Sequence, residues 1–220
     1  MNIINFHGVG EPQRSLDPGE QPFWLDVRQF RDILDRVANH PDRRHLEITF
    51  DDGNISDVDV ALPELKARGL SATFFVLTGR LGRKGSLSQR DVRTLMDNGM
   101  AIGSHGPDHA DLTTLPPHQI AGDLRRSRRI LEDCTGCALR DFAIPFGRYN
   151  AGALRGIREA GFARAYTSDG GRARESAFLQ PRRSLRSDMS EKEISAALNG
   201  HVAPLKQLRR MVGMGLKRFQ

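Results

Sequence analysis

The sequence has few cysteines, few aromatic residues and no long hydrophobic run. Two cysteines and one tryptophan occur among 220 residues, and aromatic residues make up 6% of the chain. Cys134 and Cys137 form a lone Cys-x-x-Cys that could be a redox pair or half of a zinc site, but no second pair is present and it lies at a predicted helix end. We therefore interpret both as packing and turn residues. Because no stretch approaches the roughly 18 apolar residues of a membrane span, we expect a soluble globular protein.

Positive charge is scarce outside the C-terminal segment. The net charge is +6, but residues 201–220 hold five lysines and arginines and no acid, so most of the excess belongs to them. A nucleic-acid-binding face would spread cations over a docking surface with interleaved aromatic residues. We expect no nucleic-acid partner.

The two ends of the chain suggest location and domain limits. The N-terminal residues lack a basic segment followed by an apolar one, which predicts a cytoplasmic protein rather than a secreted one. We expect one domain over residues 1–200 and a basic amphipathic tail over residues 201–220. The tail could lie on an anionic membrane surface or pack as a terminal helix with a solvated basic face. Gly213 and Gly215 disfavour a stable helix there.

Short runs rich in Val, Ile, Phe and Thr alternate with helical patterns along the chain, which predicts parallel strands joined by helices in an α/β domain. A polar stretch with three prolines and two glycines, residues 10–22, is the predicted loop over the site. The predicted strands are 2–6, 46–50, 71–77, 100–104, 142–145, 163–168 and 181–185, and the predicted helices are 26–40, 57–69, 86–99, 118–134 and 151–161.

Three polar segments follow predicted strands, at the carboxyl edge where α/β domains place their sites. Asp51 and Asp52 follow one strand, His105 and His109 another, and PFG (145–147) a third. Taken alone, the first segment could be a turn and the second a polar loop. Together, one carboxylate and two imidazoles make a three-ligand set with an open fourth position, which is typical of catalytic zinc. The second carboxylate is then available as a general base.

The three segments resemble the motifs of the polysaccharide deacetylases of the NodB-homology type, carbohydrate esterase family 4. TFDDG (49–53) is similar to the first motif, SHGPDHADL (104–112) to the second and FAIPFG (142–147) to the third. The resemblance implies a distorted barrel of the (β/α)7 type. The site residues that it implies are Asp51 as the general base, Asp52, His105 and His109 as ligands of zinc or another divalent ion, the backbone N–H of Phe146 as an oxyanion donor, and Pro145, Gly147 and Arg182 as substrate contacts.

The sequence departs from the family pattern at the arginine that usually holds the base, because Ala143 occupies that position. Arg182 or Arg183, from a late predicted strand, could supply the missing cation. Gly106 replaces the usual Ser or Thr after the first histidine, which leaves both ligands intact.

The usual C-terminal Leu-x-His motif, the source of the general acid, is also missing. His7 ends the first predicted strand and His201 lies late in the chain. Because a barrel brings its first and last strands together, either could serve. We prefer His7, since some family members resemble this chain in an N-terminal FH segment; a packed or capped histidine is the structural alternative.

The sequence therefore predicts a metal-dependent hydrolase that removes N-acetyl groups from sugar units of an exopolysaccharide or a lipid-linked precursor. Two alternatives stay open. The same kind of domain could hydrolyse small amides or imides, or it could be a catalytically inactive sugar-binding or scaffold domain. The sequence does not indicate an oligomeric state.

Overall fold

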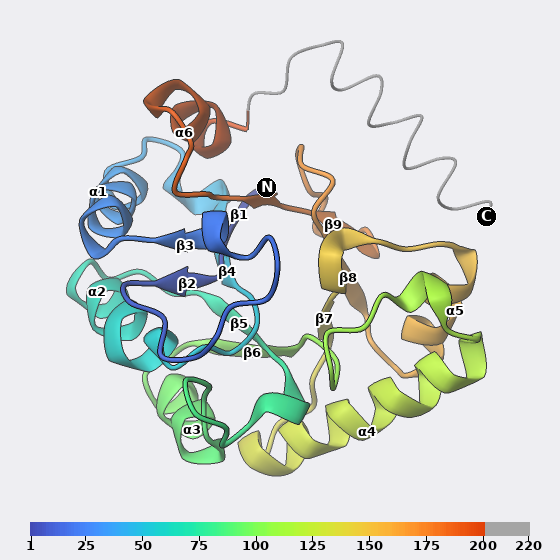
Figure 1. Cartoon of the computed structure of the whole chain (residues 1–220). Coiled ribbons are helices and arrows are strands. Elements are labelled where there is room, and N and C mark those ends of the chain that lie inside the picture. Colours follow the sequence, from blue (N-terminus) through green and yellow to red (C-terminus); the bar gives the residue numbers. More distant parts are fainter. Residues whose placement is uncertain (201–220) are drawn as a thin grey trace.

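A parallel sheet of eight strands forms the centre of the structure, a computed structural model that describes residues 1–200 (Figure 1). All neighbouring strands in it run parallel. In spatial order they are β10 (Arg183–Ser184), β1 (Asn2–Phe6), β4 (Leu46–Phe50), β5 (Thr73–Val76), β6 (Ala101–Ser104), β7 (Asp141–Ala143), β8 (Arg164–Thr167) and β9 (Leu179–Pro181).

The sheet nearly closes into a barrel at a single segment. β9 and β10 stand at opposite ends of the strand order, yet Arg182 alone separates them in the chain. Residues 179–181 pair with β8, and residues 183–184 pair with β1. The seven predicted strand segments each contain part of this sheet, and the predicted α/β barrel is confirmed.

Residues 1–200 contain six α-helices. Figure 1 shows helices around the outer face of the barrel. The Ser88–Asp91 capping box predicted from the sequence begins the third helix, and Gly136, in the left-handed conformation, ends the fourth. The helix over residues 191–198 was not predicted. The helices are α1 (Val27–Ala38), α2 (Leu62–Ala67), which continues the π-helix η3 (Asp57–Ala61), α3 (Gln89–Asp97), α4 (Pro117–Thr135), α5 (Ala151–Glu159) and α6 (Glu191–Leu198).

Five short 3-10 helices lie in the connections within the described part of the chain, and three of them contribute Phe23, Arg80 and Phe146 to the cavity at the carboxyl edge of the strands. They are η1 (Gln21–Phe23), η2 (Arg43–His45), η4 (Thr78–Arg80), η5 (Leu112–Thr114) and η6 (Pro145–Gly147).

The side chains of each strand alternate between two apolar clusters because successive residues point to opposite faces. Between the sheet and the helices, Phe6 packs against Phe30 of α1 and Phe50 of β4, with ring centroids 5.1 and 5.2 Å apart. Inside the barrel, Phe75 packs against Tyr166. Burying each large apolar side chain stabilises the fold by about 1.5–3 kcal/mol. The barrel interior is thus filled below the carboxyl edge of the strands.

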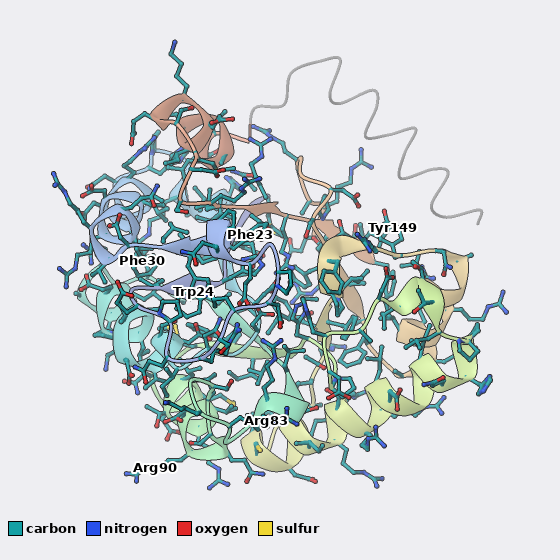
Figure 2. The ribbon with its side chains drawn as sticks, in the orientation of Figure 1. Phe23, Trp24, Phe30, Arg83, Arg90 and Tyr149 are labelled. Carbon is teal, nitrogen blue, oxygen red and sulfur yellow. The ribbon has the colours of Figure 1, made fainter. Side chains whose placement is uncertain are left out.

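A strap, defined here as residues 10–23, leaves the barrel after β1 and returns before α1. It connects β2 (Gly8–Val9) to β3 (Trp24–Leu25), a second, two-stranded parallel sheet that was not predicted. Gly8 permits this pairing, because a Cβ there would lie 2.2 Å from the Trp24 ring. In Figure 2, Phe23 and Trp24 lie where the strap rejoins the body of the protein.

Other sequence predictions concern the cysteines, the membrane and the tail. Cys134 is buried in the last turn of α4, Cys137 is exposed, and both are free thiols. No helix within residues 1–200 combines the length and apolar character needed to cross a membrane. The predicted amphipathic tail, residues 201–220, lies outside the described residues.

Candidate metal centre and active site

Asp52, His105 and His109 converge at the carboxyl edge of β4 and β6. One potential ligand atom from each lies within 4.8 Å of the others. The Nε2 atoms of His105 and His109 lie 3.5 and 3.8 Å from Oδ1 of Asp52. Asp52 and His105 are buried and His109 is half-buried.

The surroundings of these three side chains fit a divalent cation. Nδ1 of His105 donates a hydrogen bond to the carbonyl of Ala143 over 2.9 Å, which leaves the Nε2 lone pair facing Asp52. Burial, with His105 nearby, lowers the pKa of His109 to about 4, so its imidazole is neutral at pH 7. Oδ1 of Asp52 is buried and accepts no hydrogen bond from any of residues 1–200. Two imidazole nitrogens and one carboxylate oxygen therefore face one another, an arrangement that a cation stabilises.

Backbone strain is concentrated in this site. Three non-glycine residues within the described chain have positive φ: Asp52 (79°), His109 (53°) and Phe146 (57°). Such conformations cost about 1–3 kcal/mol each and persist where the surrounding structure holds them. All three line the same cavity. The surrounding structure thus holds these three residues of the site in strained backbone conformations, which fix the directions of their side chains and N–H groups.

Asp51, the predicted base, is held by Arg182. The Nη1 and Nη2 atoms of Arg182 donate to Oδ1 and Oδ2 of Asp51 over 2.7 and 2.8 Å, and Asn5 adds a bond of 3.0 Å to Oδ2. Burial alone would raise the pKa of Asp51, but the charge and hydrogen bonds of Arg182, together with His105 and His7, outweigh it, so the pKa lies well below its usual range. The carboxylate is therefore ionised and fixed in orientation.

Arg182 reaches Asp51 because of its place between β9 and β10. Its side chain is fully buried, and its guanidinium stacks 5.2 Å from the Phe75 ring centroid. Arg183, the alternative cation, begins β10 and is half-buried. Ala143 is buried inside the barrel. The guanidinium thus supplies the cation beside Asp51 that position 143 lacks, and it also borders the cavity. A contact of Arg182 with substrate stays a prediction.

His7 lies on the other side of Asp51. Its Nε2 is 4.0 Å from Oδ2 of Asp51, and its ring centroid is 4.8 Å from that of Phe23 on the strap. Burial lowers the pKa of His7, although the Asp51 carboxylate opposes the shift. Nδ1 of His7 is buried and has no partner within the described residues. His201, the alternative acid, lies outside the described residues.

The third motif folds into η6 beside His109. Pro145 and Gly147, the predicted substrate contacts, are buried, and the cavity wall here consists of Ile144 and Phe146. Gly147 is fixed as glycine, since its φ is 63° and a Cβ would lie 2.7 Å from Cβ of Ser168. The Phe146 side chain, by contrast, is 56% exposed.

These groups surround a cavity of about 1080 Å³ at the carboxyl edge of the strands. The strap forms part of its wall, as predicted for residues 10–22, and Asp17 of the strap accepts from Arg80 over 2.7 Å. Sequence reasoning missed Arg80 and Phe23, because neither belongs to a motif. Residues of the wall outside the motifs include Asp17, Phe23, Arg80, Ser168, Arg186 and Met189.

A second buried acid was also missed. Asp57, at the start of η3, is 1% exposed, and neither carboxylate oxygen has a hydrogen-bond partner within the described residues. Burial, with Asp52 and Asp51 nearby, raises its pKa well above the usual range. Burial thus favours the protonated form of Asp57.

Comparison with known proteins agrees with the motifs. The family model for polysaccharide deacetylase matches residues 38–165. The "Putative polysaccharide deacetylase YxkH" of Bacillus subtilis is 29% identical over 185 residues, 79% of this chain and 66% of that protein. The peptidoglycan-N-acetylglucosamine deacetylase PgdA of Listeria monocytogenes is 30% identical over 108 residues, 49% of this chain and 22% of that protein. This chain thus spans less than two thirds of either relative.

Solved structures share the fold. The deacetylase PplD of Streptococcus pyogenes, in complex with acetate, superposes with a TM-score of 0.76 and 20% identity, over 90% of this chain and 97% of that one. IcaB from Ammonifex degensii gives a TM-score of 0.72 and 22% identity, over 90% and 96% of the two chains. At these identities the likeness concerns the fold.

Proposed function

Because the chain belongs to the polysaccharide deacetylase family, we propose that it is a metal-dependent hydrolase that removes N-acetyl groups from sugar units of a glycan. One observation carries the proposal: Asp52, His105 and His109 converge on a common point, with the ionised Asp51 held beside them in a large cavity. We include in the proposal that the natural substrate is an exopolysaccharide or a lipid-linked precursor, which only the sequence resemblance suggests.

Asp52, His105 and His109 are assigned to a divalent ion, and their two nitrogens and one oxygen favour zinc. When bound, such an ion would polarise the acetamide carbonyl and acidify a water molecule. The protein supplies the remaining groups. Asp51 accepts a proton from the attacking water, and because Arg182 fixes both of its oxygens, the carboxylate does not rotate away as the charge changes.

Stabilisation of the oxyanion is assigned to η6, and protonation of the leaving group to His7, which directly follows β1. The backbone N–H of Phe146 stabilises the negative charge that develops on the acetyl oxygen, a contribution of roughly 3–4 kcal/mol for one such donor. His7 protonates the departing nitrogen as the carbon–nitrogen bond breaks. Oδ2 of Asp51 lies 4.0 Å from Nε2 of His7. The proton that Asp51 takes from the attacking water can therefore pass to His7 and from there to the departing nitrogen. The products are acetate and a free amino sugar.

The test is acetate release from N-acetylglucosamine oligomers and a crude acetylated polymer, with and without a chelator. We expect release that stops on chelation, returns on addition of zinc, and falls by orders of magnitude in Asp51→Asn. Chelator-insensitive turnover, or full activity in Asp51→Asn, would rule out this mechanism. A parallel screen of small amides and imides tests the alternative substrate class, which the size of the cavity disfavours.

An inactive binding domain would not need a base beside a ligand set, so the Asp51–Arg182 pair favours an enzyme. Metal content of protein purified without chelators separates the two, since the proposal requires one ion per chain. The domain limits of 1–200, a cytoplasmic location and contact of residues 201–220 with a membrane remain predictions.

A further inference from the structure

We propose that the Phe146 side chain is the platform on which the sugar ring of the substrate stacks, and that it selects N-acetylated sugars over small acetylated compounds. The inference rests on the proposed deacetylase function and adds to it. It assigns to the ring a task separate from that of the Phe146 backbone N–H.

The first observation is exposure. Phe146 is the one exposed large hydrophobic side chain within residues 1–200, at 56%. An isolated aromatic ring on a protein surface is unremarkable, but this ring lies in the wall of the cavity that holds the metal ligands and the base. Apolar surface exposed inside a site is surface that a ligand can cover.

The second observation is the backbone conformation. A positive φ of 57° is uncommon for a bulky residue, and glycine adopts it without strain. The chain does use glycine at the next position, where φ is also positive. A glycine at position 146 would present the same backbone N–H at lower cost. The N–H alone therefore does not account for a phenylalanine here, and the ring needs its own explanation.

The position of the ring fits a sugar that carries the reacting acetamide. The Phe146 ring centroid lies 4.3 Å from that of His109, a proposed metal ligand. The Arg148 guanidinium lies 5.7 Å from the Phe146 centroid and is itself held by Asp111 over 3.0 Å. The ring is thus supported by two neighbours while more than half of its surface stays open.

The chemistry of a pyranose ring matches such a surface. Equatorial hydroxyl and acetamide groups point outward from the ring edge, which leaves C–H groups on its faces. Aromatic faces carry partial negative charge and attract these slightly positive hydrogens. Stacking also buries apolar surface of both the sugar and the aromatic ring. A sugar stacked on Phe146 can direct its acetamide toward His109 and the neighbouring ligands, whereas a small amide lacks the ring that would cover Phe146.

The experiment compares the wild type with Phe146→Leu and Phe146→Trp. Two probes are used: N-acetylglucosamine oligomers as substrates, and acetate as a competitive inhibitor that carries the acetyl part without the sugar. In Phe146→Leu we expect KM for the oligomers to rise about tenfold and the inhibition constant of acetate to stay within about threefold. Phe146→Trp should restore KM to within about threefold of the wild type.

The outcomes separate the proposed role of the Phe146 ring from the proposed deacetylase function. An equal weakening of oligomers and acetate in Phe146→Leu would mean that the substitution disturbs the oxyanion site, and would overturn the inference. An unchanged KM in Phe146→Leu, or no recovery in a folded Phe146→Trp variant, would overturn it as well. Failure of the wild type to release acetate from any N-acetylated glycan would overturn the proposed function, and the inference with it.

Discussion

Replacing Arg182 with methionine removes the cation that holds Asp51 and leaves a carboxylate alone in the barrel interior. Asp51 is 3% exposed and Arg182 is fully buried, so the pair is shielded from water. Breaking a buried pair by removing one partner costs about 3–5 kcal/mol. For a chain of this size, such a loss lowers the melting temperature by roughly 6–20 °C. Activity should fall too, because the base loses the two Arg182 bonds that orient it and keeps only the bond from Asn5.

Urea unfolding in the presence of a chelator measures the loss, because urea does not screen charges and the chelator removes any contribution from bound metal. Arg183→Met is the matched control: it removes the same side chain one residue later, where the arginine is half-buried, and we expect a cost below about 1 kcal/mol. The double variant Arg182→Met with Asp51→Asn removes both charges. It should be less destabilised than the sum of the single variants by about 2 kcal/mol or more.

The pH dependence gives an independent check. Because the folded pKa of Asp51 is depressed, the pair stabilises the protein above the ordinary carboxyl value of 3.8, and this stability is lost as pH falls through the folded value. Arg182→Met should lack this loss on the acid side. Strict additivity in the double variant, or equal costs for Arg182→Met and Arg183→Met, would refute the reasoning.

Three further predictions concern other buried groups of the site. His7→Gln should lower kcat for acetate release by about 10²–10⁴-fold with one metal ion still bound per chain, and loss of the metal would contradict the assigned role. His105→Ala should lose the stoichiometric metal. The control variant His118→Ala, on the exposed side of α4, should retain it, and elemental analysis after gel filtration measures both. Because burial raises the pKa of Asp57, wild-type stability should fall as pH rises above 3.8, whereas Asp57→Asn cannot ionise and should not show that fall. Melting temperatures from pH 5 to 8 test it, and a constant difference between the two proteins would argue against a protonated Asp57.

The site also explains how a member of this family can lack the usual arginine. Position 143 lies on β7, and its carbonyl orients His105, while its side chain only fills the barrel interior. The cation enters instead from the segment that closes the barrel, where Arg182 bonds to Asp51, Asn5 and Thr49. The segment that closes the barrel through its backbone thus also carries the side chain that orients the base.

Local sequence determined the strands, the caps and the placement of the motifs. Runs such as 46–50 and 100–104 form strands because β-branched and aromatic residues suit a pleated, buried surface, and the Ser88–Asp91 box begins its helix through bonds within one turn. Since parallel strands end at a common edge, the sequence also predicted that Asp52, His105 and His109 would meet. These features depend on residues a few positions apart or on the alternation of strands and helices, and both are visible in the linear sequence.

Tertiary structure alone decided which of two adjacent arginines holds the base, how far Phe146 is exposed, and that the strap walls the cavity. Arg182 and Arg183 are indistinguishable by composition, and only the change of pairing partner between β9 and β10 turns Arg182 inward. The ion pair that results joins residues 131 positions apart. Such contacts depend on the register and closure of the whole sheet, because a shift of one residue reverses the face to which a strand side chain points.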